Sequence, residues 1–175
     1  MNDQRIDGYA RALFEIARAE GTIDQVEDEL FRFARAFESS DALRSTLADQ
    51  TLPAARRQGI VEDLLGGKAS NTTVQLVSMI AGSGRASDLV AIIDRLVARA
   101  SSAKNLEVAE VRTAVPLTGD QETRLAAALT KATGKSVNLK VVVDPSVIGG
   151  LVATIGDTVI DGSVRSRLEQ LKSRL

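Results

Sequence analysis

Glycines and two aspartates near the end of the chain are the residues best suited to chemistry. Gly149 and Gly150 stand at the start of a predicted strand, and Asp157 and Asp161 lie four residues apart in the next stretch. Glycines at a helix start can cradle a phosphate, and paired carboxylates can bind Mg²⁺ or exchange protons. A small phosphate-binding or nucleotide-dependent enzyme is therefore one hypothesis for this sequence.

The spacing of these residues favours a structural role instead. No G-x-G-x-x-G follows a strand, and the nearest approach to a P-loop, around Lys68, has Glu62 in place of its first glycine and Ala69 in place of its hydroxyl. Asp157 and Asp161 occupy positions where turn and cap residues are expected, and the glycines suit tight turns. We interpret them as turn residues and expect no catalytic residue, cofactor or metal ligand.

The composition excludes several further classes of function. The 175 residues include no Cys and no His, which excludes thiol nucleophiles, imidazole bases and the usual nitrogen and sulfur ligands of metals. The net charge is −1 and aromatic residues are 3% of the chain, so a nucleic-acid adaptor lacks both a basic stripe and stacking rings. No apolar run approaches about 20 residues, and the N-terminus lacks a signal core, so a bacterial cytoplasmic location is expected.

The pattern of apolar residues predicts how such a chain folds. Up to about Lys104, apolar residues recur every three or four positions between Gly and Pro breakers, which predicts a bundle of six helices. The predicted helices cover residues 6–19, 23–37, 41–48, 53–65, 71–81 and 87–102, and the last of these has capping oxygens at Ser87 and Asp88.

The period changes to alternation after Asn105, which indicates a domain boundary. Strands are predicted over residues 106–115, 137–143, 150–155 and 158–160, with a helix between the first two that begins at a Thr118–Gln121 capping box. A last helix is predicted from Asp161 or Ser163. The expected fold is α+β and mainly α, with a helical bundle over residues 1–105 and a small α/β domain over residues 106–175.

Two stretches resemble one known family. Tyr9-Ala10-Arg11-Ala12-Leu13-Phe14-Glu15-Ile16-Ala17 is similar to the opening helix of the delta subunits of F-type ATP synthases and of their mitochondrial counterpart, the oligomycin-sensitivity-conferring protein. The C-terminal stretch resembles the signature of the same family and reads Ile148-Gly149-Gly150-Leu151, then Ile155-Gly156-Asp157-Thr158-Val159-Ile160-Asp161-Gly162-Ser163-Val164-Arg165-Ser166-Arg167-Leu168. The resemblance covers the whole chain and implies the same two-domain architecture.

The resemblance implies that the bundle binds the N-terminal helix of one alpha subunit, at the top of the catalytic head, in a groove between the first and fifth helices. Apolar and small residues of these helices are expected to line it: Tyr9, Ala10, Leu13, Phe14, Ala17, Val74, Val77, Ser78 and Ala81. From the pattern alone, the same apolar faces would be ordinary bundle core in most proteins.

The resemblance also implies that residues 106–175 grip the peripheral-stalk b subunits, or b and b-prime. The residues expected to face the stalk, or to belong to the signature, are Val147, Ile148, Gly149, Gly150, Gly156, Asp157, Asp161, Gly162, Ser163, Arg165, Leu168 and Leu171. The implied role is a non-catalytic stator subunit, one copy per complex and without membrane insertion, at the cytoplasmic face of the bacterial inner membrane. It would resist rotor torque so that proton flow is coupled to ATP synthesis.

Overall fold

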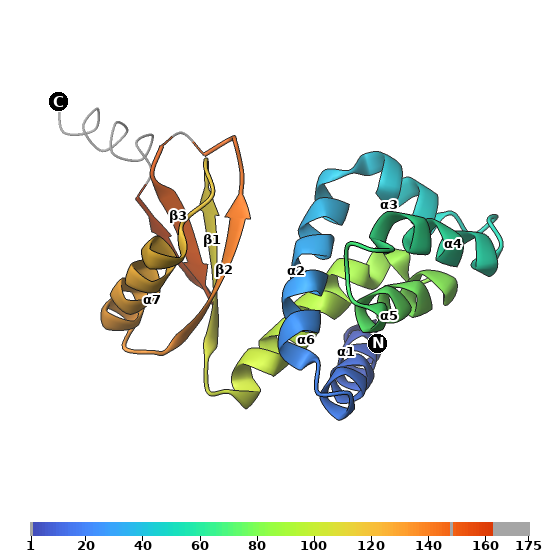
Figure 1. The fold of residues 1–175 in the computed structure, drawn as a ribbon, viewed down its shortest axis with the longest axis horizontal. Helices are drawn as coiled ribbons and strands as arrows, with labels where there is room; N and C mark the ends of the chain where they lie inside the picture. The colour runs from blue at the N-terminus through green and yellow to red at the C-terminus, as the bar shows by residue number, and fades with distance from the viewer. Residues whose placement is uncertain (1, 148, 163–175) are drawn as a thin grey trace. The chain divides into compact units, whose positions relative to one another are not determined.

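The computed structural model describes residues 2–147 and 149–162. The chain forms two compact units, Met1–Ala100 and Ser101–Leu175. The sequence interpretation places the boundary after residue 105, where the apolar period changes. Across the described residues there are seven α-helices and four strands (Figure 1), and the predicted α+β, mainly helical fold class is confirmed.

The first unit is the helical bundle. Its helices are α1 (Asn2–Ala19), α2 (Ile23–Ser39), α3 (Asp41–Ala48), α4 (Ala54–Leu65), α5 (Asn71–Gly82) and α6 (Leu89–Ala103), the last continuing past the end of the unit. Gly21 takes a positive φ of 70° directly after α1, and Ser40 and Ser70 accept backbone hydrogen bonds as the N-caps of α3 and α5. Apolar side chains such as Leu30 and Ile92 are fully buried between the helices.

The start of α6 differs from the sequence expectation. A 3-10 turn, Ala86–Asp88, occupies the positions of the predicted capping residues, and the α-helix begins only at Leu89. The carboxylate of Asp88 accepts a hydrogen bond from Arg85 Nη1 at 3.2 Å. The side chain expected to cap the helix is therefore engaged by an arginine of the preceding turn.

The second unit is a four-stranded sheet with one helix against it. Its elements are β1 (Glu107–Thr113), α7 (Gly119–Thr133), β2 (Val137–Val143), β3 (Leu151–Ile155) and β4 (Thr158–Asp161), and the strand order is β2-β1-β3-β4. The β1–β2 pair is parallel, which requires a crossover, and α7 supplies it; the other two pairs are antiparallel. The predicted capping box at the start of α7 is confirmed by both of its hydrogen bonds.

Alternation along the strands builds the core of this unit. Ala109 and Val111 of β1, Ala153 and Ile155 of β3 and Leu129 of α7 are buried together. Of their sequence neighbours on β1, which point to the other face, Glu110 and Arg112 are charged and Val108 is apolar. The predicted last helix lies outside the described residues.

Candidate functional site

The residues predicted to line a groove mostly face the interior of the bundle. Seven of the nine are buried: Ala10, Leu13, Phe14, Ala17, Val77, Ser78 and Ala81. The other two, Tyr9 and Val74, are half-buried. A side chain such as Leu13, with 0% of its surface exposed, cannot contact a partner while the bundle stays folded. A partner that bound this part of the bundle would have to contact exposed neighbours of these side chains.

Ion pairs show which side of α1 adjoins another helix of the bundle. Asp7 accepts from Arg99 of α6 at 3.1 Å, and Asp3 accepts from Arg95 of the same helix at 2.6 Å. Nine residues span two and a half helical turns, so Ile16 lies on the opposite side of α1 from Asp7. Ile16 is one of the large apolar side chains that remain exposed, at 39%. Exposed Ala12 precedes it by one turn.

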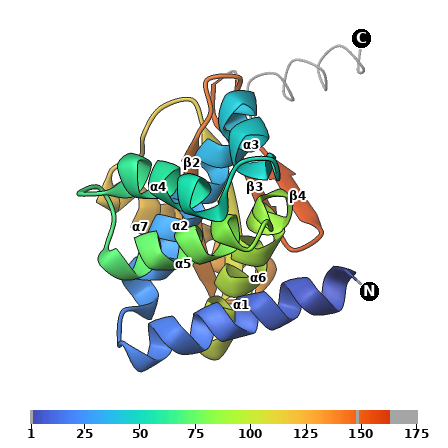
Figure 2. The same ribbon diagram turned by 90° about the vertical axis from the view of Figure 1, so that its right-hand side faces the viewer.

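The helix α5 runs beside the side of α1 that carries Ile16. Thr72 Oγ1 donates to the Glu20 carboxylate at 2.5 Å, so the start of α5 adjoins the end of α1 (Figure 2). Met79 follows Thr72 by seven residues, close to two full turns, and therefore lies on the same side of α5. It is 40% exposed. Val74, two residues after Thr72, lies well round the helix from that side.

Together these residues form an exposed, mainly apolar surface along the two helices. We call it the α1–α5 surface and define it as Tyr9, Ala12 and Ile16 of α1 with Gln75 and Met79 of α5. The sequence interpretation did not name Ala12, Ile16, Gln75 or Met79 among the groove residues, because it followed the inward apolar stripe. The sequence did contain a signal for two of them, because Ile16 and Met79 are large apolar residues that lie outside the inward stripe.

The start of α5 is fixed by a carboxylate of α2. Glu29 accepts hydrogen bonds from Ser70 N at 2.9 Å, Ser70 Oγ at 2.7 Å and Thr73 Oγ1 at 2.6 Å, and Gln25 Nε2 donates to its other oxygen. Partial burial acts to raise the pKa of Glu29, but these hydrogen bonds, that of Thr73 foremost, outweigh it and lower the pKa to about 2. The charged carboxylate therefore holds α5 to α2.

Replacing Glu29 should weaken the bundle in a pH-dependent way. Because its folded pKa lies below the unfolded value of 4.5, its stabilisation is complete above pH 4.5 and disappears as the pH falls toward 2. After allowance for solvent screening, Glu29→Gln should lower the free energy of unfolding by about 1–2 kcal/mol at pH 7. Urea titrations at pH 7 and pH 3 measure this, with Glu62→Gln, an exposed site on α4, as the matched control. An equal loss at both pH values would contradict the assignment.

The end of α5 is fixed by an arginine of α4. Arg57 is only 6% exposed, and its guanidinium donates to four backbone carbonyls. Nε donates to Ala81 O at 2.9 Å and Nη2 to Gly82 O at 3.2 Å, both in the last turn of α5. Nη1 donates to Asp49 O at 3.2 Å and Leu52 O at 2.7 Å in the loop before α4. The carbonyls at a helix end lack partners within the helix, and Arg57 supplies a donor to two of them; Ala81 O accepts from Gly84 N as well, at 3.1 Å.

Gly149, Gly150, Gly156 and Asp157 lie in turns, as interpreted, whereas Asp161 is the last residue of β4. Gly149, Gly150 and Gly156 are exposed and take positive φ values of 64°, 74° and 55°. Asp157 lies in the β3–β4 turn and Asp161 at the far end of β4, which separates their Cα atoms by about 13 Å at the usual rise of a strand. This separation is too large for one metal ion or one shared proton.

Of the other residues predicted to face the stalk, the structure describes Gly162 and Val147. Gly162 N donates to Leu151 O at 2.9 Å and so extends the β3–β4 pairing by one bond. Val147 is half-buried in the loop before β3. Ile148, Ser163, Arg165, Leu168 and Leu171 lie outside the described residues.

One end of the sheet carries exposed apolar side chains. The parallel strands β1 and β2 both end there, and Asp144 N donates to Thr113 O at 2.7 Å to join the two ends. Val115 is 65% exposed and Val143 is 48% exposed. We call Val115, Val143 and Val147 the sheet-end surface. Val115 and Val143 were not among the residues predicted to face a partner.

Metal and membrane sites were also sought in the described part of the chain. No group of three or more acidic residues there could hold a metal ion. Within residues 2–147 and 149–162, no helix is both long and apolar enough to cross a bilayer.

The fold and these surfaces define a mainly helical α+β protein, made of a six-helix bundle and a small α/β unit. Residues 6–175 match the family model described as the ATP synthase delta (OSCP) subunit. The chain belongs to this family.

Relatives that carry the name ATP synthase subunit delta support the assignment. The chain is 43% identical to the protein of Streptomyces avermitilis over 91% of its own length and 58% of the relative's. It is 42% identical to that of Nocardia farcinica, over 94% and 61% of the two chains. It therefore spans less than two thirds of these two relatives. The Desulforudis audaxviator protein is 35% identical and is covered over 92% of its length.

A solved structure shares the fold. A chain in the cryo-EM structure of the Toxoplasma gondii mitochondrial ATP synthase hexamer superposes with a TM-score of 0.58 and 21% sequence identity. The match covers 97% of the present chain and 96% of that one. At this identity the likeness concerns the fold alone.

Proposed function

We propose that this chain is a non-catalytic stator subunit that links the catalytic head of an F-type ATP synthase to its peripheral stalk. The observation that carries the proposal is the family match over residues 6–175, which includes both units. A stator must resist the torque of the rotor so that proton flow is coupled to ATP synthesis. Such a role needs two binding surfaces and no reaction centre.

The α1–α5 surface is the proposed contact with the head. Its partner would be the N-terminal helix of one alpha subunit, which would lay an apolar stripe across Ile16 and Met79. Ala12 has a small side chain and would let the partner backbone approach closely, while the two larger residues would act as anchors. The fixing of α5 by Glu29 and Arg57 supports this use, because an ordered surface loses little entropy on binding.

The sheet-end surface is the proposed contact with the peripheral-stalk b subunits. Val115 and Val143 offer apolar area beside the turn glycines of the family signature. The residues beyond 162 that carry the apolar positions Leu168 and Leu171 stay part of this proposal on their sequence pattern. One copy per complex would sit at the cytoplasmic face of the bacterial inner membrane, without entering it.

The mechanical task sets the energy that these contacts must supply. A joint that holds under torque needs slow dissociation, and nanomolar affinity corresponds to about 12 kcal/mol. Two partners that belong to the same complex raise each other's effective concentration, so neither contact has to supply the whole affinity alone.

Charge placed on the α1–α5 surface should weaken head binding strongly without unfolding the bundle. In Ile16→Asp and Met79→Asp, an exposed apolar anchor becomes a carboxylate that the partner helix would have to desolvate. Each variant should weaken binding of a peptide copying the alpha N-terminal helix by about 100-fold, or roughly 2–3 kcal/mol. Isothermal calorimetry on the full chain measures this, and circular dichroism checks that the helices persist.

A matched control comes from α4. Leu64 is 38% exposed, close to Ile16 and Met79, but belongs to another helix. Leu64→Asp should bind the peptide as the unmodified chain does. Equal affinity of all three variants would place the contact elsewhere, and equal loss in all three would show a general effect of added charge.

A further inference from the structure

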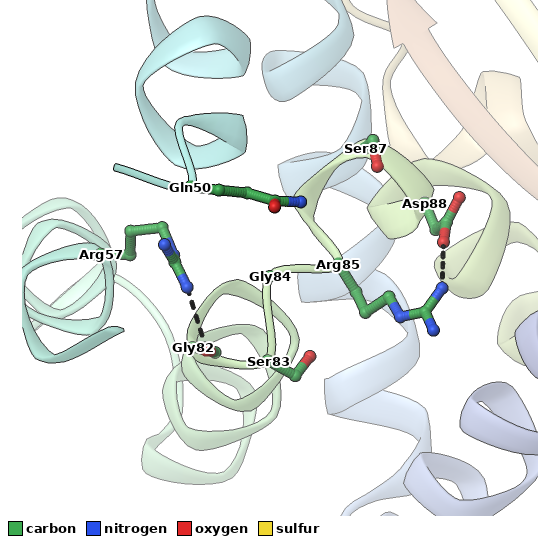
Figure 3. A pocket seen from close by; sticks show the side chains of 8 residues that line it. All are labelled: Gln50, Arg57, Gly82, Ser83, Gly84, Arg85, Ser87 and Asp88. Atoms are coloured by element: carbon green, nitrogen blue, oxygen red, sulfur yellow. Dashed lines mark hydrogen bonds and ion pairs between the residues drawn. The ribbon is translucent and has the colours of Figure 1, made fainter. Parts of the chain in front are cut away.

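A polar pocket of about 480 Å³ lies in the bundle, at the turn that joins α5 to α6 (Figure 3). Its charges are compensated within the bundle, because Arg85 pairs with Asp88 at 3.2 Å and the Asp49 carboxylate interacts electrostatically with Arg57. The sheet-end surface of the second unit differs from this pocket, because its apolar side chains remain exposed to water.

This surface includes one end of the core side of the sheet. The strand register places Val143 of β2 opposite Thr113 of β1, and Thr113 opposite Leu151 of β3. Because Thr113 follows the buried Ala109 and Val111 in alternation, this row points to the side on which α7 packs. Val143 is nevertheless 48% exposed, so α7 leaves this end of the core side partly open.

A second exposed valine lies beside the same row. Thr113 Oγ1 donates to Val115 O at 2.5 Å, which holds Val115 next to the end of β1. Val115 is 65% exposed. Apolar area left in contact with water is unfavourable, so Val115 and Val143 together suit an apolar segment that would cover them.

The described chain ends next to this row. Gly162 N donates to Leu151 O at 2.9 Å, so the residues after Gly162 start one strand away from Leu151. Residues 163–175 follow, and their pattern predicts a helix with one apolar stripe and a largely charged opposite side. The stripe has residues at i, i+4, i+7 and i+11: Val164, Leu168, Leu171 and Leu175.

A helix of this length can reach the exposed valines. Neighbouring strands lie about 4.8 Å apart, so Val143 on β2 is about 14 Å from the end of β4, across β3 and β1. A helix rises about 1.5 Å per residue, so the rise from Val164 to Leu175 is about 17 Å. The stripe is therefore long enough to cross the whole row.

We propose that residues 163–175 cover the sheet-end surface with this apolar stripe in the chain that has no bound partner. The contact is intramolecular, and the attachment of the segment at Gly162 gives it a high effective concentration at the surface. A peripheral-stalk subunit that binds the same surface has to displace the segment. This last consequence alone rests on the proposed function.

The test is a spin-label measurement on the full chain, which has no Cys of its own. Ser173→Cys, carrying a nitroxide, places the label on the segment outside the stripe. The NMR methyl signals of Val115 and Val143 should be lost and should return when ascorbate reduces the label. Lys135→Cys places the same label before the start of β2, and the length of that strand, about 20 Å, separates it from Val143. This control label should leave both signals visible.

Two further variants of the Ser173→Cys chain test the stripe itself. Leu171→Asp puts a charge in the stripe and should restore both methyl signals with the label still active. Gln170→Asp adds the same charge next to it but outside the stripe, and should leave the signals lost. Signals that persist beside the Ser173 label, or an equal result in Leu171→Asp and Gln170→Asp, would overturn the proposal.

A mixing experiment excludes a second copy as the occupant. A ¹³C-labelled chain without the nitroxide is mixed with an unenriched chain that carries it, and the methyl signals of the first should persist. Their loss would show that the segment of another copy covers the surface, which would also overturn the proposal. Because these measurements use the chain alone, their failure would leave the stator role standing.

Discussion

Arg57→Ala should lower the free energy of unfolding by about 3–5 kcal/mol, a large part of the stability of a domain this size. The variant removes four hydrogen bonds to backbone carbonyls; Ala81 O keeps a bond from Gly84 N, but Gly82 O loses its Arg57 donor at the helix end. Arg57→Lys should recover only part of the loss, because an ammonium has three donors and cannot reach four carbonyls. Urea denaturation at pH 7, followed by circular dichroism, measures both.

The adjacent residue provides the control. Arg56 carries the same charge on the same helix but is exposed, so Arg56→Ala should change the free energy by no more than about 0.5 kcal/mol. If Arg56→Ala and Arg57→Ala were equally stable, Arg57 would not be the group that fixes the end of α5.

Leu13→Asp is expected to unfold the bundle outright. Leu13 is fully buried, and a carboxylate at its position has no partner to offset desolvation, so the cost exceeds about 4 kcal/mol. Val77→Asp should behave in the same way for the same reason. Thermal melts followed by circular dichroism should show loss of the cooperative transition in both variants, whereas Ile16→Asp, three residues along α1 from Leu13, should retain it.

Comparison of Leu13→Asp with Ile16→Asp distinguishes a core residue from a residue of the proposed contact surface. Loss of head binding by Leu13→Asp would follow from unfolding and would say nothing about a groove. If the Leu13→Asp protein stayed folded but no longer bound the alpha peptide, the burial of this side chain would be contradicted. Leu13 would then belong to the surface that contacts the partner.

Local patterns were sufficient to predict the elements. Spacing of three and four residues, with Gly21 as a stop, gave the helices of the bundle, and alternation after Asn105 gave the strands. The Thr118–Gln121 capping box formed as predicted, because both of its hydrogen bonds are local. The α-helix α6 begins two residues later than expected, because a 3-10 turn, Ala86–Asp88, occupies its predicted start.

The face of a helix that meets a partner was harder to predict. An apolar stripe identifies the side that is buried, and in Leu13 and Val77 it identified the bundle core. Ile16 and Met79 are isolated apolar residues among polar ones, and isolated apolar residues are common on protein surfaces. Only the placement of α1 beside α5 brings them into one surface.

Contacts between residues far apart in the sequence could not be predicted either, because only the folded structure brings them together. Arg57 bonds to carbonyls up to 25 residues away, and Glu29 bonds to Thr73, 44 residues away. Neither pairing has a local sequence signal, so the fixing of α5 at both ends was not foreseen. The separation of Asp157 from Asp161 likewise depends on a strand lying between them.

The most direct test of the central claim is a three-component binding measurement. The catalytic head, a soluble fragment of the peripheral-stalk b subunits and the full chain are mixed, and the masses of the complexes are read by size-exclusion chromatography with light scattering. The account predicts one complex that holds all three components, and its loss when the chain is omitted or carries Ile16→Asp with Met79→Asp. The account would be contradicted if the head and the stalk fragment joined as firmly without the chain as with it.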